Sequence, residues 1–210
     1  MLCVPGNHDV GDASGEAPFD APLLAAYVRQ FGPDHWAHRA GDWLLLGVNA
    51  QLMGSGTTQE QAQWRWIEQQ AGLAGAQTRT LLFLHRPVLR SAPGEAARKG
   101  RYVPGLACDR LLNGALRHSL RMVVSGHTHQ HLDTSDNGVR HVWVPSTGFI
   151  LPDHMQPRLG EKVVGIGLLD LQADGAAFDL WCPDGMLRHQ VSELQAFQTL
   201  VAVSETADTH

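Results

Sequence analysis

The sequence predicts an α/β fold in which two mixed β-sheets form a sandwich flanked by helices. Up to about residue 129, apolar runs typical of buried strands alternate with segments whose apolar residues recur at helical spacing. Beyond that point, turn dipeptides such as Asn137-Gly138, Asp174-Gly175 and Asp184-Gly185 separate strand-like runs. Helix–strand alternation followed by hairpins implies two layered sheets. With 210 residues, 43% of them hydrophobic, the chain can bury the core of one domain, which we expect to span 1–203 before a disordered tail at 204–210.

Strands are predicted wherever a short apolar run ends at turn-forming residues. Leu2 to Val4 is a stub of such a run, stopped by Pro5-Gly6. Longer runs at 43–48, 80–84 and 122–124 predict buried strands. The run at 43–48 precedes a predicted helix, and the run at 80–84 ends at His85.

Three amphipathic segments predict helices between these strands. Asp20 can cap a helix that Gly32-Pro33 stops. Thr58 and Gln61 form a capping box for a second helix ending near Gly72. A long loop at 91–105 then leads to a third helical pattern at 111–116.

Charge and cysteine content exclude several function classes. The formal net charge is -5 and the pI is near 6.1, so the sequence lacks the excess of basic residues typical of proteins that bind a nucleic-acid polymer. It also has no run of basic residues that would bind an anionic membrane. No apolar run reaches membrane-spanning length. Three dispersed cysteines without a Cys-x-x-Cys pair are typical of buried thiols in a reducing cytosol. We therefore expect a cytoplasmic protein with a small substrate, and the sequence leaves its oligomeric state open.

Three polar clusters follow apolar runs and carry the chemistry. They are Gly6-Asn7-His8-Asp9, His85 and Gly126-His127-Thr128-His129. A parallel sheet would bring them together at its carboxyl edge, where open α/β sheets bind ligands. Imidazole nitrogens and amide oxygens are good ligands for zinc, manganese or iron, and two histidines spaced i, i+2 can diverge to different ions. The constellation therefore favours a two-metal centre over a lone structural ion.

Each cluster by itself has a simpler interpretation. The first could be a side-chain-capped turn, His85 a core-edge histidine, and the last a solvated strand end. Their joint occurrence in this order favours the metal site. The other histidines are scattered and receive no role, and neither does Arg86.

The GNHD motif, the strand-end histidine and the GHxH motif, present in this order, resemble the calcineurin-like metallophosphoesterase superfamily. The segments 5–12 and 41–49, the Gln-rich helix with Trp66, and Pro145-Ser146-Thr147 most resemble its bacterial cyclic-nucleotide phosphodiesterase branch. The resemblance implies hydrolysis of a small phosphate ester, with a phosphodiester, and within that class a cyclic nucleotide, as the candidate substrate.

The resemblance also implies a role for each motif residue. Asn7, His85 and His127 would bind one metal ion, and His129 would bind the other. His8 would donate a proton or hydrogen bond to a phosphate oxygen, with Asp9 orienting its ring. The cofactor would be two divalent or trivalent ions of manganese, iron or zinc.

The sequence departs from the family pattern at its start. The opening Asp-x-His and the following Gly-Asp-x-x-Asp, which supply three ligands including a bridging aspartate, have no counterpart ahead of Gly6. We therefore expect Met1 to be an internal methionine or the gene to be truncated, and this chain by itself to be inactive and poorly stable. The rival interpretations are a non-catalytic remnant or interaction module of the same fold, and a mononuclear metal hydrolase acting on a non-phosphate ester.

Overall fold

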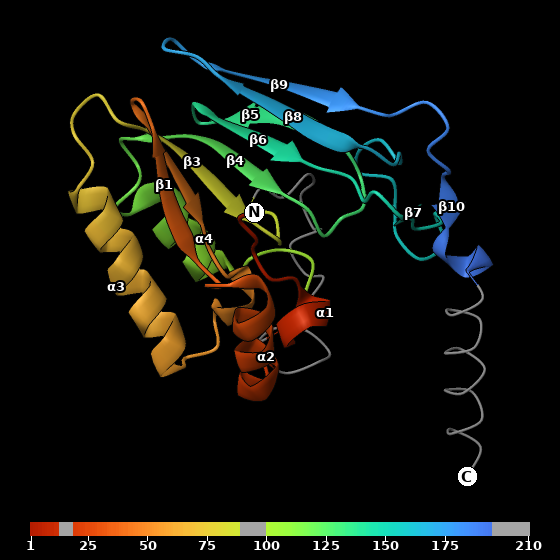
Figure 1. Cartoon of the computed structure of the whole chain (residues 1–210), viewed down its shortest axis with the longest axis horizontal. Helices are drawn as coiled ribbons and strands as arrows, with labels where there is room; N and C mark the ends of the chain where they lie inside the picture. The colour runs from red at the N-terminus through yellow and green to blue at the C-terminus, as the bar shows by residue number, and fades with distance from the viewer. Residues whose placement is uncertain (13–18, 89–99, 195–210) are drawn as a thin grey trace.

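A six-stranded mixed sheet forms the centre of the molecule in the computed structural model, which describes residues 1–12, 19–88 and 100–194 (Figure 1). Its strand order is β1-β2-β3-β4-β6-β5. The four inner strands are parallel, and the edge strands β1 and β5 are antiparallel to their neighbours. The carboxyl ends of the inner strands therefore meet at one edge of the sheet. The strand bounds are β1 Trp36–Ala40, β2 Trp43–Gly47, β3 Arg79–Leu84, β4 Leu120–Ser125, β5 Leu132–Asp136 and β6 Val139–Trp143.

The inner strands β2, β3 and β4 are mainly apolar on both faces because both faces are covered. Alternate residues such as Leu44 and Leu82 belong to one buried cluster, which also holds side chains of the helices. Their neighbours Trp43 and Leu81 belong to a second cluster on the opposite face. A strand buried on both faces reads as a continuous apolar run, which is why these segments are recognisable in the sequence.

Helices α3 (Thr58–Gly72) and α4 (Gly105–Asn113) cover the first face of the sheet (Figure 1). The predicted capping box of α3 is wrong by one residue, because Thr57, and not Thr58, accepts the N–H of Glu60 at 3.2 Å. The Glu60 carboxylate instead accepts the backbone N–H groups of Gly54 and Gly56 at 2.8 and 2.7 Å, so the loop before α3 determines where the helix begins.

The remaining helical segments lie near the carboxyl edge or beyond the sheet. Among the described residues they are α1 (Asn7–Val10), α2 (Ala21–Phe31) and the short 3-10 turns η1 (Ala50–Leu52) and η3 (Val191–Glu193). The predicted cap of α2 is confirmed, since the Asp20 carboxylate accepts the N–H of Leu23 at 3.0 Å. None of the helices in the described ranges is long and apolar enough to cross a membrane.

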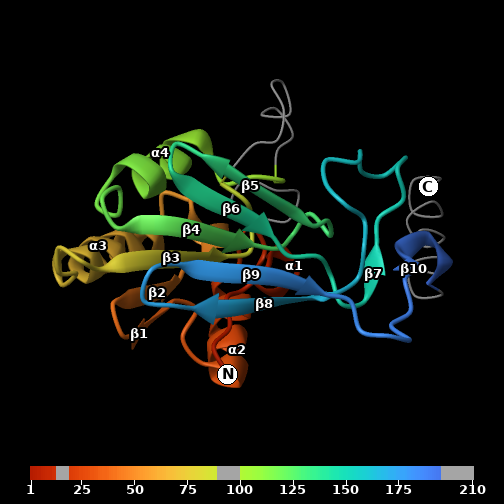
Figure 2. The same ribbon diagram turned by 90° about the horizontal axis from the view of Figure 1, so that it is seen from above.

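The hairpin β8 (Ile166–Leu171) and β9 (Ala176–Trp181) forms a second layer over the other face of the sheet (Figures 1 and 2). Its inward side chains, including Leu169, Leu171 and Phe178, pack on the cluster around Trp43 and Leu81. The predicted α/β sandwich is therefore confirmed. A further two-stranded parallel sheet joins β7 (Phe149–Ile150) to β10 (His189–Gln190).

Several local predictions need correction. The stub at 2–4 is not a strand, because the Cys3 carbonyl accepts the indole N–H of Trp36 at 2.8 Å instead of pairing with a strand. The turn at Asp184-Gly185 leads from β9 to β10, which pairs with β7, so it does not close a hairpin. Cys182 is exposed, and Cys3 and Cys108 are half-buried, so none of the three is a fully buried thiol. The predicted tail at 204–210 and most of the predicted loop at 91–105 lie outside the described residues.

Candidate metal centre

The three polar clusters meet at the carboxyl edge of the sheet. His85 directly follows β3, and His127 lies two residues beyond β4, which is the neighbour of β3. The backbone N–H of Gly126 donates to the His85 carbonyl at 3.0 Å, so the two strand ends are joined. Asn7 opens α1 on the same edge (Figure 1).

Atoms of three predicted ligand residues lie in a row, each within hydrogen-bond distance of the next. The Asn7 Oδ1 atom is 3.0 Å from His85 Nε2, which is 3.0 Å from His127 Nδ1. Two ligand atoms that each lie about 2.1 Å from one metal ion, with a right angle between the two bonds, are about 3.0 Å apart. The Asn7–His85 and His85–His127 spacings therefore match those of neighbouring ligands on one ion.

His129 makes no hydrogen bond with these three residues in the described ranges, although its charge acts on the pKa of His85 and of His127. The backbone φ angles of His127 and His129 are 67° and 50°. This left-handed backbone conformation is rare for residues other than glycine. The His129 Nδ1 atom lies 3.2 Å from the Phe149 carbonyl, and the two rings are 4.6 Å apart. If Nδ1 donates its proton to that carbonyl, Nε2 carries the lone pair that a metal would use.

The histidines of the site are kept neutral. Burial lowers the pKa of His85 to about 4, against the charge of Asp9, which raises it, and with a smaller lowering by nearby positive groups. Burial and then the charge of His85 lower the pKa of His127 to about 3, while a backbone hydrogen bond with Gly100 acts the other way. Burial also lowers the pKa of His129. At neutral pH these rings therefore hold lone pairs that are free to bind a cation.

His8 and Asp9 are exposed at the mouth of the site. Both lie near His85, because their charges act on its pKa in opposite directions. The Asp9 carboxylate accepts the backbone N–H of Gly6 at 2.7 Å, so it closes the loop that presents Asn7. Within the described residues Asp9 makes no hydrogen bond with His8, and its proposed action on that ring stays a prediction.

A buried ion pair that the sequence analysis did not assign holds the loop in place. Arg86, next to His85, is fully buried, and its Nη1 donates to Asp12 Oδ1 at 2.7 Å. Asp12 lies just past α1, so the pair fastens the GNHD loop to the end of β3. A side chain at Gly6 would lie 3.0 Å from His85 Cε1, so glycine permits this close approach. In the sequence, the feature that could have identified Arg86 is its position directly after the strand-end histidine His85.

The fourth predicted ligand does not complete a second cluster in the part of the chain that the structure describes. Across residues 1–12, 19–88 and 100–194, no group of three or more His, Cys, Asp or Glu side chains is placed to hold an ion. Asn7, His85 and His127 are not such a group, because Asn7 contributes an amide oxygen and asparagine is not one of those four residue types. Asn7, His85 and His127 thus bring together an amide oxygen and two imidazole nitrogens, a donor set that suits a metal ion, and His129 lies outside this hydrogen-bonded group.

Comparison with known proteins gives one curated relative and several remote structures. No family model matches the chain. A "Probable cyclic nucleotide phosphodiesterase" of Psychrobacter sp. (strain PRwf-1) is 26% identical over 191 residues, which cover 83% of this chain and 52% of the relative. The chain thus spans about half the length of that relative.

Two solved phosphatases are among the similar structures. A dimetal phosphatase from Danio rerio is 16% identical, with a TM-score of 0.41 over 60% of this chain and 54% of the other. The purple acid phosphatase PPD1 from yellow lupin (Lupinus luteus) seeds is 15% identical, with a TM-score of 0.46 over 67% of this chain and 30% of the other. In its ordered GNHD, strand-end histidine and GHxH motifs and in its match to the curated relative, this chain is similar to calcineurin-like metallophosphoesterases.

Proposed function

We propose that this chain acts as a metal-dependent phosphodiesterase with a dinuclear centre and small phosphate diesters, cyclic nucleotides among them, as substrates. The observation that carries the proposal is the convergence of Asn7 Oδ1, His85 Nε2 and His127 Nδ1 at 3.0 Å spacings. The name of the Psychrobacter relative supports the choice of a phosphodiester over other esters.

Asn7, His85 and His127 would hold one ion, and His129 would contribute to the second. Ions bound there would polarise phosphate oxygens and lower the pKa of a bound water. The amide of Asn7 brings no charge, and the two rings are neutral, so the cation keeps its full charge for the anionic substrate.

His8 would contact the phosphate instead of a metal. It is exposed at the mouth of the site and close enough to His85 and His129 for its charge to lower the pKa of each. A substrate oxygen placed over the ligands would therefore be within reach of its ring. His8 would donate a proton or hydrogen bond to that oxygen, and Asp9 would hold the loop from which it projects.

The test combines metal content with hydrolysis. The purified chain would be loaded with Mn²⁺ or Zn²⁺, and its metal content would be measured by elemental analysis beside its hydrolysis of bis(4-nitrophenyl) phosphate. We expect His127→Ala to lose both bound metal and activity. His38→Ala, which removes an exposed histidine of β1, is the matched control and should change neither. A His127→Ala protein with full metal content and rate would contradict the proposal.

A metal-binding module without catalysis is the second candidate. It is favoured by the lack, in the described ranges, of a cluster of carboxylates and histidines around His129. The same experiment separates the two functions. One bound ion per chain that depends on His127, with no hydrolysis of the diester in any metal, would identify the module.

A further inference from the structure

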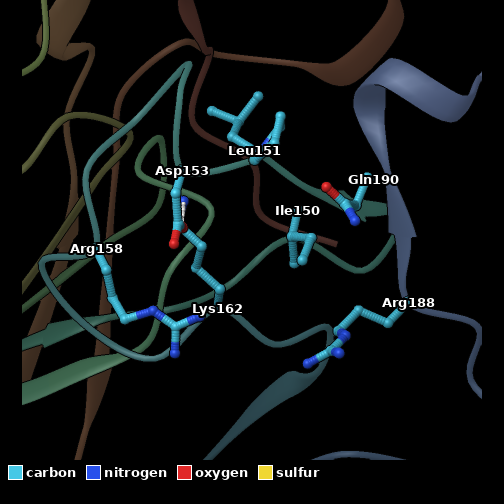
Figure 3. Close-up of a pocket in the computed structure, with 8 residues that line it drawn as sticks. Ile150, Leu151, Asp153, Arg158, Lys162, Arg188 and Gln190 are labelled. Carbon is cyan, nitrogen blue, oxygen red and sulfur yellow. Dashed lines mark hydrogen bonds and ion pairs between the residues drawn. The ribbon is translucent and has the colours of Figure 1, made fainter.

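A polar cavity is lined by residues other than Asn7, His85 and His127. Its volume is about 310 Å³, and it lies between the segment that follows β7 and the segment that leads into β10 (Figure 3). Figure 3 shows Asp153, Arg158 and Lys162 on one side and Arg188 on the other, with Ile150 between them. Cavities of this size accommodate small ligands or parts of them.

The buried cation of this cavity is Lys162. Its side chain is 2% exposed, and its Nζ donates to Asp153 Oδ1 and to the Gln156 carbonyl, both at 2.7 Å. An ammonium has three N–H donors, so two of them are engaged. Burying a lysine is costly unless it is paired, and Asp153 supplies that pairing.

The guanidinium groups of Arg158 and Arg188 are not paired with a carboxylate as Lys162 is with Asp153. Arg158 and Arg188 are exposed, and neither makes an ion pair or hydrogen bond with another described residue. The hydrogen bond from Lys162, with the charge of Arg158 added, holds the pKa of Asp153 below its usual range. The cavity thus gathers three cations around a single carboxylate, which already pairs with one of them.

The cavity adjoins the candidate metal centre through β7. Phe149 accepts a hydrogen bond from His129 if that ring carries its proton on Nδ1, and the next residue, Ile150, lines the cavity. On the other side, Gln190 of β10 pairs with Ile150 and also lines it. The strand that contacts His129 thus also lines the cationic cavity.

We propose that the cavity lined by Arg158, Lys162 and Arg188 is a binding site for a phosphate or carboxylate group. Guanidinium groups bind such anions through paired charge-assisted hydrogen bonds. The site itself does not depend on catalysis. Only its use as a subsite for a second anionic group of the substrate rests on the proposed function.

The binding test uses inorganic phosphate and a metal-free protein. Isothermal titration calorimetry in the presence of EDTA removes any contribution of bound metal. We expect saturable binding of phosphate, weakened about tenfold or more by Arg158→Gln and by Arg188→Gln, since each removes a charge-assisted contact. Arg65→Gln, an equal change of charge at an exposed position of α3, should bind as the unmodified protein does. Circular dichroism spectra would verify that all variants are folded.

Two results would overturn the proposal: no saturable binding, or equal weakening by Arg65→Gln. A second arm identifies the source of the anion in the metal-loaded protein, by comparing KM for thymidine 5′-(4-nitrophenyl phosphate) with and without a 3′-phosphate. A lower KM for the 3′-phosphorylated ester, lost in Arg188→Gln, supports a substrate subsite. Equal KM values with retained phosphate binding support a site for a separate anion. If the protein hydrolyses neither ester, the proposed function fails while the calorimetry still decides the anion site.

Discussion

His85 and His127 are buried imidazoles at the ends of adjacent strands, and their surroundings keep them uncharged. Burial lowers the pKa of His85 to about 4 and that of His127 to about 3, against an ordinary value near 6.5. Well above pH 6.5 both rings are neutral in the folded and the unfolded chain. As the pH falls toward 4, the unfolded chain takes up protons that the folded chain does not, and the free energy of unfolding decreases.

Replacing His127 with glutamine removes one of these titrating groups. In EDTA we expect the free energy of unfolding of the unmodified protein to fall between pH 6.5 and 4, and that of His127→Gln to fall less steeply over the same window. Urea denaturation at pH 7, 6 and 5 would measure both slopes. Parallel slopes would mean that the ring of His127 takes up protons equally in the two states.

His8 should affect rate without affecting metal content. Because its proposed partner is the substrate phosphate, His8→Ala should lower turnover by about a hundredfold or more, with bound metal unchanged. Steady-state hydrolysis of the diester and elemental analysis on the same sample would check this. Loss of metal from His8→Ala would instead make His8 a ligand.

At the scale of elements, the site depends on how the GNHD loop is attached to β3. The attachment is the buried pair of Arg86 and Asp12, whose side chains are 0% and 5% exposed. Removing one partner from a buried ion pair leaves the other charge in a poorly solvated place, which costs far more than the loss of an exposed pair. The surface pair of Arg140 and Asp133, about one-third exposed on β6 and β5, offers the comparison.

We expect Asp12→Ala to lower the free energy of unfolding by about 3–5 kcal/mol. Asp133→Ala should lower it by about 1 kcal/mol or less, since exposed pairs are solvated and screened. Chemical denaturation of both variants would measure the difference, and metal titration would show whether the loop also loses its ligand geometry. Similar small losses in the two variants would show that the buried pair does not fasten the loop.

For the whole molecule, the central sheet is stabilised from both sides. Helices α3 and α4 pack on one face, and the hairpin β8–β9 packs on the other (Figure 2). Leu81 is fully buried between sheet and hairpin, whereas Leu168 lies on the outer face of the hairpin and is 49% exposed. The two leucines therefore distinguish a buried inner layer from a hydrated outer surface.

Leu81→Ala should destabilise the protein by about 2–5 kcal/mol, because it removes buried apolar contacts and leaves a cavity. Leu168→Ala should change stability by about 0.5 kcal/mol or less, as surface substitutions do. Thermal or urea unfolding would compare them. Equal effects would mean that the hairpin does not pack on the sheet in solution.

The sequence predicted the inner strands well, because β2, β3 and β4 are continuous apolar runs bounded by turn residues. It failed where tertiary contacts outweigh local signals. The stub ending at Val4 lacks a strand partner in the described ranges, and the cap of α3 moved to Thr57 because Glu60 binds the preceding loop. Asp184-Gly185 forms a turn, but the pairing of β10 with β7 prevents a hairpin.

By itself the sequence determined which side chains are chemically suited to a metal and that His85 and the GHxH motif each follow a buried strand. Only the tertiary structure decided their distances. Asn7 and His85 are 78 residues apart in the chain, and Arg86 and Asp12 are 74 apart. Their contacts follow from the order of β3 and β4 in the sheet and from the path of the GNHD loop over it. Local propensity and periodicity act over a few residues, so they cannot encode such contacts, nor the cavity that Arg158 and Arg188 enclose from opposite sides.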